Sequence, residues 1–143
     1  MKIAIEEGKK AGQIDEVPIG AVLVAKTCEV IATAHNQMIR LSDPTAHAEI
    51  LALRSAGRIS GNYRLAGTTL YITVEPCVMC MGAIINARIY RVVFGAKDPK
   101  WGAAGSLYDF ASDRRFNHHP EIIGGICEEE CKRLMQEFFK QRR

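Results

Sequence analysis

The sequence predicts a three-layer α/β/α fold around a central mixed sheet of five strands. Runs rich in β-forming residues alternate with helical stretches along all 143 residues. The first two β-rich runs are joined by only three residues, which is typical of an antiparallel hairpin. Helices separate the later strands, and such crossovers make neighbouring strands parallel. Because a chain of this length is the usual size of one domain, we expect residues 1–143 to form a single domain.

Composition limits the classes of protein that are possible. Hydrophobic residues make up 48% and charged residues 24% of the chain, as in globular proteins. No apolar run approaches the roughly 20 residues that span a bilayer, and the first ten residues are too acidic for a signal peptide, so we expect a cytoplasmic protein without membrane contact. The formal net charge of +3 permits a nucleic-acid partner without requiring one.

The first half of the chain predicts a helix, a hairpin and a second helix. Asp43 can cap a helix whose first residue is Pro44 and whose apolar stripe runs toward Gly57. The expected earlier elements are a helix over Met1–Gly12 and strands over Val17–Ala25 and Glu29–Asn36.

The second half predicts three strands and two helices. Glu75 and Pro76 open a helix that contains two cysteines, and a loop-rich stretch over 97–120 holds one helical turn near Leu107. The expected elements are strands over Thr69–Val74 and Ile89–Ala96 and around Ile122 and Ile123, and helices over Cys77–Ala87 and Cys127–Arg142.

A metal site is indicated by three residues. Cys77 and Cys80 are spaced i, i+3, so on a helix their sulfurs leave the same face and can bind one ion. Alone, a C-x-x-C pair also serves redox chemistry or simply packs. His47, near the start of the preceding helix, adds a third ligand of the right type and favours zinc.

Three protein ligands leave one tetrahedral position for water, which is the arrangement of catalytic zinc. Glu49 supplies a group that takes a proton from this water and returns it to the substrate. Residues i and i+2 of a helix point about 200° apart, so His47 and Glu49 share a site only if the ion lies beyond the helix N-terminus.

The combination of H-A-E at 47–49 with P-C-V-M-C at 76–80 is typical of zinc nucleobase deaminases. Beyond it, nearly the whole chain resembles the bacterial tRNA-specific adenosine deaminases of the cytidine/deoxycytidylate deaminase superfamily. The resemblance is carried by VPIGAVLV, AHN, DPTAHAEILALR, LYITVEPCVMCMGAI, GAKDPKWGAAGSL and FFKQRR.

This resemblance implies a cytidine deaminase-like fold, one Zn²⁺ per subunit and a homodimer. It also implies that the wobble adenosine of a tRNA anticodon stem-loop flips into the zinc pocket. There, water activated by the metal attacks carbon 6 of the base and leaves inosine. The first helix looks shorter than that of the family.

The resemblance also assigns substrate contacts. Asn36 is expected to hydrogen-bond the base, with the backbone N–H of Ala48 as a second base contact. Asp98 and Lys100 resemble contacts to the RNA sugar and backbone, and Asn117 resembles a contact to a neighbouring anticodon nucleotide. Three of these residues have a simpler alternative, because Asn36 and Asp98 are also typical turn residues and Lys100 is also ordinary surface charge.

The C-terminal residues form an expected RNA-binding tail made of Phe139, Lys140, Arg142 and Arg143. An aromatic ring and several cations are what single-stranded nucleic acid requires. Cations at a helix C-terminus also offset the helix dipole, so a structural role stays open.

The remaining cysteines and histidines receive structural assignments. Cys127 and Cys131 are spaced i, i+4 beside apolar residues, which favours core thiols over a second metal site. Cys28 is expected to be an exposed free thiol. His118 and His119 are expected on the surface of their loop.

Two competing functions need the same zinc ligands. A deaminase of a free base or nucleoside, such as guanine or cytidine, uses the same metal and glutamate, and only the substrate distinguishes it. A non-catalytic zinc module requires a fourth protein ligand, which the sequence does not offer at a recognisable spacing. We therefore predict a tRNA adenosine deaminase with Glu49 as proton carrier.

Overall fold

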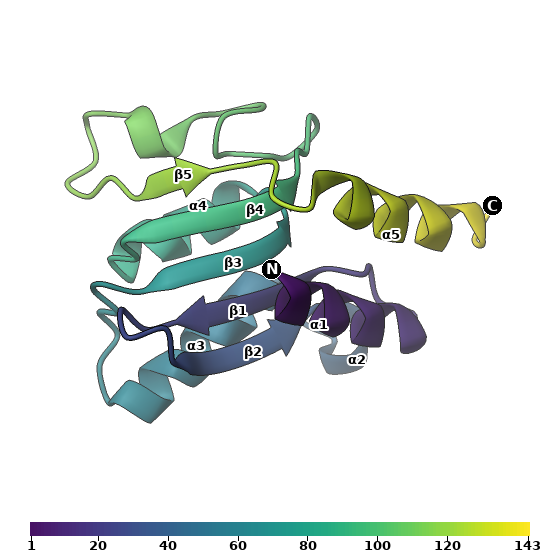
Figure 1. Ribbon diagram of the computed structural model, residues 1–143, viewed down its shortest axis with the longest axis horizontal. Coiled ribbons are helices and arrows are strands. Elements are labelled where there is room, and N and C mark those ends of the chain that lie inside the picture. Colours follow the sequence, from purple (N-terminus) through teal and green to yellow (C-terminus); the bar gives the residue numbers. More distant parts are fainter.

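The computed structural model describes residues 1–143 and contains a mixed sheet of five strands in the order β2-β1-β3-β4-β5 (Figure 1). The strands are β1 (Gly20–Val24), β2 (Val30–His35), β3 (Thr69–Val74), β4 (Arg91–Ala96) and β5 (Glu121–Ile123). β1 pairs antiparallel with β2 and β3, whereas β4 pairs parallel with β3 and β5. The predicted mixed sheet and its opening hairpin are confirmed.

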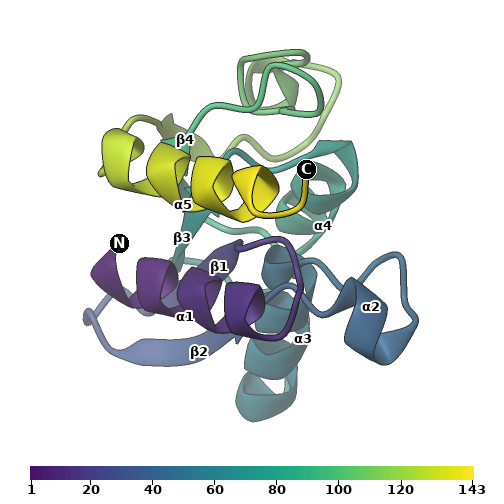
Figure 2. The same cartoon turned by 90° about the vertical axis from the view of Figure 1, so that its right-hand side faces the viewer.

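Helices cover both faces of the sheet. They are α1 (Lys2–Gln13), α2 (Met38–Leu41), α3 (Ala48–Ser60), α4 (Val78–Asn86) and α5 (Glu128–Lys140), with a 3₁₀ turn η1 (Phe110–Ser112). The neighbouring helices α1 and α5 lie on one face, and α3 and α4 on the other (Figures 1 and 2). The predicted three layers are confirmed. None of the helices is both long and apolar enough to span a membrane.

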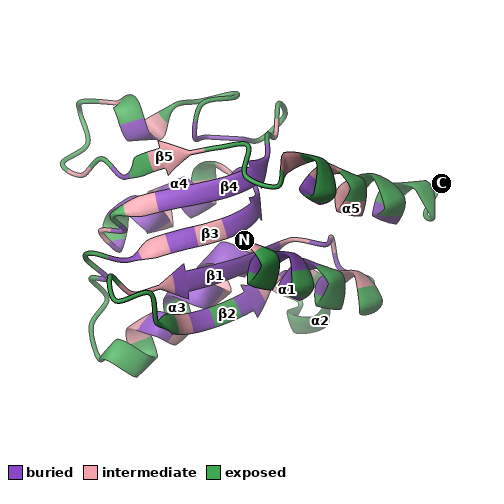
Figure 3. Cartoon of the chain, in the orientation of Figure 1, coloured by how far each residue is buried: buried purple, intermediate pink, exposed green.

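Two apolar clusters hold these layers together, and Figure 3 shows in purple the buried residues of the strands and helices. The larger one lies between the sheet and the pair α3 and α4, and includes Leu23, Leu70 and Ile84, all fully buried. The smaller one joins Ile5 of α1 to Cys131 of α5 across the other face. Burial of this apolar surface is the main force that fixes the helices on the sheet.

The helices α1 and α5 approach the sheet at glycines. A Cβ atom on Gly20 would lie 1.9 Å from the Ala4 carbonyl oxygen of α1, and one on Gly95 would lie 2.3 Å from the Cys131 sulfur of α5. Both distances are far below van der Waals contact. Any larger residue at either position would therefore push a helix off the sheet.

Four strands direct their chain ends to the same edge of the sheet. Because β1 alone runs in the opposite direction, β2, β3, β4 and β5 all have their carboxyl ends at this edge. Asn36 follows β2, Cys77 follows β3 by three residues, and Asp98 follows β4 by two. Ligand sites of open α/β sheets lie at this edge, so the topology gathers the predicted site residues there.

The predicted start of the helix that carries Glu49 is wrong. The helix begins at Ala48 and not at Pro44. Asp43 caps a turn instead, because its Oδ1 accepts both the N–H and the hydroxyl of Thr45, at 2.8 and 2.7 Å. The side chain that could have capped the helix thus caps a turn instead, five residues before the helix begins.

Two smaller predictions also need correction. The helical turn expected near Leu107 lies at Phe110–Ser112. Cys127 is exposed and not a core thiol, whereas Cys131 is buried as predicted. Cys127 precedes the helix in a left-handed conformation (φ 55°), so the i, i+4 spacing does not place it on the face of Cys131.

Candidate active site

Two metal ligands occupy the position just before a helix. His47 precedes α3 and Cys77 precedes α4, and both have an extended backbone, with ψ of 152° and 177°. Cys80 lies within the first turn of α4. The two helix starts therefore direct an imidazole and two thiols into one space. This space lies beyond the N-terminal end of α3, as the spacing of His47 and Glu49 requires.

The ligand atoms have the separations that a tetrahedral zinc ion requires. The Nδ1 of His47 lies 3.7 Å from the Cys77 sulfur and 3.5 Å from the Cys80 sulfur. For Zn–N and Zn–S bonds of about 2.0 and 2.3 Å at a tetrahedral angle, the expected nitrogen to sulfur distance is about 3.5 Å. The distances from His47 to the two sulfurs thus match those expected of a zinc site.

No fourth protein ligand completes this group. The ligand atoms of His47, Cys77 and Cys80 all lie within 4.8 Å of one another, and no other His, Cys, Asp or Glu joins them. Structural zinc sites use four protein ligands, whereas catalytic sites keep one position for water or substrate. This geometry argues against a non-catalytic zinc module.

Cys77 already favours the thiolate form that binds metal, whereas Cys80 keeps its proton. The hydrogen bond from the Cys80 thiol lowers the pKa of Cys77 to about 4, and His47 assists. The same bond, together with burial, raises the pKa of Cys80 above its usual range. Because a metal cation replaces the protons that these groups share, zinc binding and proton release are coupled here.

Glu49 lies in the first turn of α3 and is 3% exposed. Burial raises the pKa of its carboxyl group to about 7. A carboxyl group with a pKa near neutrality can both accept and return a proton, which is the property of a general acid and base.

Asn36 is held in one orientation beside this carboxyl group. Its Oδ1 accepts the backbone N–H of Ala48 at 2.8 Å, which leaves its Nδ2 amide group directed elsewhere. Asn36 Nδ2 and Glu49 Oε2 are the two buried side-chain polar atoms of the chain that have no hydrogen-bond partner. Buried polar groups are normally paired, so a donor and an acceptor left free in one site indicate a place for a polar ligand.

Asp98 and Lys100 lie in the loop that follows β4. The side chain of Asp98 accepts the N–H groups of Lys100 and Trp101, at 3.0 and 3.2 Å, so it forms a turn whatever else it binds. This loop reaches the metal ligands, because the N–H of Ala103 donates to the Pro76 carbonyl at 2.9 Å. The sequence did not reveal the buried Glu75 beneath this loop, since a lone glutamate before P-C carries no recognisable signal.

The predicted tail lies beside Lys100. A shallow groove between the end of α5 and this loop is lined by Lys100, Met135, Gln136, Phe139, Lys140, Arg142 and Arg143. Phe139 is 45% exposed, as expected of a ring available for contact. Arg142 is already engaged, since it donates to Asp15 at 2.5 Å and its guanidinium lies 3.5 Å from the centre of the Phe138 ring. The tail therefore has a structural role for at least one of its cations.

Asn117 lies in a separate exposed loop between η1 and β5. Its Oδ1 accepts a hydrogen bond from Arg88, just after α4, at 2.7 Å. No hydrogen bond joins it to the other predicted substrate contacts. His118 in the same loop is bonded to the Ile89 carbonyl and is only partly exposed.

Comparison with known proteins agrees with this site. The model of the cytidine and deoxycytidylate deaminase zinc-binding region matches residues 1–96, and the chain belongs to this family of zinc-dependent deaminases. Over all 143 residues it is 48% identical to the tRNA-specific adenosine deaminases of Haemophilus influenzae and Bacillus subtilis, covering 83% and 88% of their lengths.

A solved structure from work on A-to-I editing by tRNA:A34 deaminases at the wobble position of transfer RNA is similar in fold as well. It superimposes with a TM-score of 0.91 and 46% sequence identity, covering 94% of this chain and 96% of that chain. Both the sequence relatives and the structural relative therefore point to the same branch of the family.

Proposed function

We propose that this chain is a tRNA adenosine deaminase that converts the wobble adenosine of an anticodon to inosine. Adenosine and water react to give inosine and ammonia, as the bond from carbon 6 to the exocyclic nitrogen breaks and a bond from carbon 6 to the water oxygen forms. The observation that carries the proposal is the three-ligand metal group beside the two unpaired buried atoms, Asn36 Nδ2 and Glu49 Oε2.

His47, Cys77 and Cys80 hold one Zn²⁺ in this proposal. When bound, the ion supplies the positive charge that lowers the pKa of a water molecule toward about 7. Glu49 takes the proton of that water on its free oxygen and delivers it to the base, which its burial and near-neutral pKa allow. Exclusion of solvent by the surrounding core keeps this proton within the site.

Asn36 orients the base. Because its Oδ1 is fixed by Ala48, its Nδ2 donates to an acceptor atom of the purine. Ala48 acts as a second base contact only if its N–H is shared between Asn36 and the base, as bifurcated bonds at helix termini commonly are.

RNA lies across the loop and the tail in this proposal. Asp98 and Lys100 contact the sugar and backbone near the flipped base, and Asn117 contacts a neighbouring nucleotide of the anticodon loop. The tail residues Phe139, Lys140, Arg142 and Arg143 continue this surface, where a ring and cations suit a single-stranded loop. The same substrate implies a cytoplasmic enzyme, with which five free cysteines agree.

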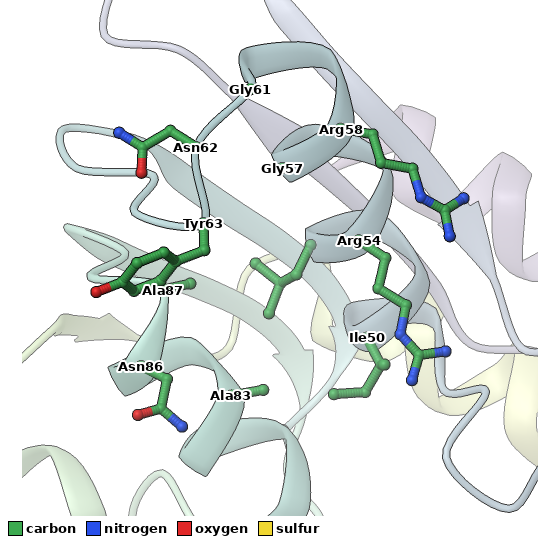
Figure 4. Close-up of a pocket in the computed structure, with 11 residues that line it drawn as sticks. Ile50, Arg54, Gly57, Arg58, Gly61, Asn62, Tyr63, Ala83, Asn86 and Ala87 are labelled. Atoms are coloured by element: carbon green, nitrogen blue, oxygen red, sulfur yellow. The ribbon is translucent and has the colours of Figure 1, made fainter.

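We further propose that residues 1–143 act as one deaminase domain within a homodimer. A groove between α3 and α4 has an apolar floor that includes Ile50 and Ala83, with Arg54 and Arg58 on one side and Tyr63 and Asn86 on the other (Figure 4). An apolar centre with a polar rim is the usual anatomy of a protein interface. The same two helices hold the metal ligands, because His47 directly precedes α3, Cys77 directly precedes α4, and Cys80 lies within α4.

Sedimentation velocity tests the dimer directly. The wild-type chain is expected at about twice the 15.8 kDa of one subunit. Tyr63→Glu is expected to sediment as a single chain, while Tyr90→Glu, which changes an exposed tyrosine outside the groove, keeps the dimer. A wild-type chain that sediments as a monomer at working concentrations would contradict this arrangement.

The editing activity is tested with an anticodon stem-loop that bears a wobble adenosine. After incubation with the zinc-loaded chain, digestion and mass spectrometry should detect inosine at that position and not at adenosines elsewhere in the stem. A stem-loop that stays unmodified under conditions in which the zinc content is one per chain would refute the proposal.

A further inference from the structure

The carboxylate of Glu75 lies at the centre of the loop that follows β4, and the proposed chemistry does not use it. Glu75 is 3% exposed and follows β3 directly, two residues before Cys77. Its own N–H donates to the Ala96 carbonyl at 2.8 Å, so the strand pairing of β3 with β4 continues up to it. Its backbone is therefore fixed to the sheet at the edge that carries the site.

The side chain of Glu75 accepts four hydrogen bonds from one loop. Its Oε2 accepts the N–H of Asp98 at 3.0 Å, and its Oε1 accepts the N–H groups of Ala104 and Ser106, each at 3.0 Å. The hydroxyl of Ser106 donates to Oε2 as well. None of the ion pairs of the chain includes Glu75, so these four donors alone compensate the buried carboxylate.

The loop is closed around this carboxylate without free space. Gly102 packs on it so tightly that a Cβ atom there would lie 2.4 Å from Glu75 Cδ and 2.5 Å from the Asp98 carbonyl oxygen. The N–H of Gly102 also donates to that Asp98 carbonyl at 2.8 Å. Between these fixed points the loop presents Lys100 and Trp101 to solvent, and Trp101 is 66% exposed.

We propose that Glu75 is a positioning residue that shapes the loop over residues 98–106 for RNA, so that one buried carboxylate sets the placement of Asp98 and Lys100 relative to the metal ligands. This inference rests on the proposed function for its substrate, but the order of the loop can be measured without RNA. Glu75 is neither one of the metal ligands nor one of the proposed base contacts. Its loss should therefore weaken RNA binding more than the chemical step.

The single tryptophan of the chain makes the loop directly observable. Trp101 is the only tryptophan, and its backbone N–H donates to the Asp98 side chain within the loop. Its fluorescence anisotropy and emission maximum thus report on the order of this loop in the intact, zinc-loaded protein.

The test compares Glu75→Gln with Glu16→Gln. Glu16 is the matched control, because it is another buried glutamate (1% exposed) whose carboxylate accepts a backbone N–H, that of Arg40 at 2.8 Å. We expect Glu75→Gln to keep one zinc per chain, to lower the Trp101 anisotropy, and to raise KM for the wobble-adenosine stem-loop by about tenfold, the factor that 1.4 kcal/mol gives, with kcat changed much less. Glu16→Gln should leave the Trp101 signal and KM unchanged.

A second variant keeps the test decisive if Glu75→Gln does not fold. Gly102→Ala displaces the loop from the carboxylate while leaving Glu75 itself intact, and should raise KM in the same way with zinc retained. The proposal would be overturned if a folded Glu75→Gln kept its Trp101 anisotropy and its KM. It would also be overturned if Glu75→Gln lost zinc and Gly102→Ala kept an unchanged KM. If the wild-type chain edits no RNA, the proposed function fails, and the fluorescence result still decides whether Glu75 orders the loop.

Discussion

The metal site and the basic groove of this protein are built in opposite ways. The metal site is largely buried, with Asn36 and Glu49 almost inaccessible and His47 and Cys77 half-buried, and it contains two buried polar atoms without a hydrogen-bond partner. The groove beside Lys100 is exposed, and one of its cations, Arg142, is already paired with Asp15. Charge interactions are strong in a buried site and weak where water and salt screen them. We therefore expect changes in the metal site to have large effects on activity, and changes in the groove to have small, additive effects that depend on salt.

The largest effect is expected from a metal ligand. Cys80→Ala removes one of three ligands and should lose both zinc and activity, because two ligands bind far more weakly than three. Elemental analysis and deaminase assays measure both. Cys131→Ala is the matched control, since it also removes a buried thiol but lies on the opposite face of the sheet. A full zinc complement in Cys80→Ala would mean that the ion binds elsewhere.

The next effect separates chemistry from metal binding. Glu49→Gln keeps the size of the side chain but removes its ability to carry a proton, so turnover should fall by about 10² to 10⁴-fold. Zinc content should stay at one per chain, because Glu49 is not among the ligand atoms. Near wild-type turnover in a zinc-loaded Glu49→Gln would show that another group moves the proton.

A smaller loss is expected for the residue that orients the base. Asn36→Ala removes the free Nδ2 donor and also leaves the Ala48 N–H without its partner. We expect kcat/KM on the stem-loop to fall by the equivalent of about 1 to 3 kcal/mol. Thermal unfolding of the same variant provides the check. If stability drops sharply while activity per folded molecule is unchanged, Asn36 is only a turn residue.

The smallest effect belongs to the groove. Lys140→Ala combined with Arg143→Ala removes two exposed cations and keeps the pair of Arg142 with Asp15. Each lost phosphate contact reduces the slope of log affinity against log salt by about 0.7 for single strands, so a flattening of about 1.4 is expected.

A salt series with one anticodon stem-loop measures this slope. Arg133→Ala, an exposed cation of α5 outside the groove, should leave it unchanged. Asp15→Asn tests the opposite change, because it releases Arg142 from its ion pair. The released cation should add one phosphate contact and steepen the slope of log affinity against log salt, while the loss of an exposed ion pair costs little stability. An unchanged slope in the double variant would mean that the tail serves the helix dipole and not RNA.

The grouping of His47, Cys77 and Cys80 could be predicted because its main signals are short spacings in the sequence. The i, i+3 spacing of Cys77 and Cys80 and the short distance from His47 to Glu49 survive any small error in helix boundaries. The error at Pro44 shows this, since the helix starts four residues later and the ligands still meet.

Interactions between distant segments were not predictable from the sequence. Two examples join residues far apart in the chain. Arg142 pairs with Asp15, and the carboxylate of Glu75 accepts hydrogen bonds from the N–H groups of Ala104 and Ser106. Such contacts depend on how the strands are ordered in the sheet, and no short-range spacing encodes that order. The error at Cys127 has a local cause, because the i, i+4 rule holds only inside a helix and Cys127 precedes it.

We infer that this zinc site acts on an adenosine that RNA delivers to it. A competition reaction tests it most directly: one mixture of the zinc-loaded chain with a wobble-adenosine stem-loop, free guanine and free cytidine, followed by mass spectrometry over time. We expect inosine to appear in the stem-loop while guanine and cytidine persist, and we expect high salt to slow the formation of inosine. Consumption of guanine or cytidine with the stem-loop left intact would contradict it and identify a deaminase of free bases or nucleosides.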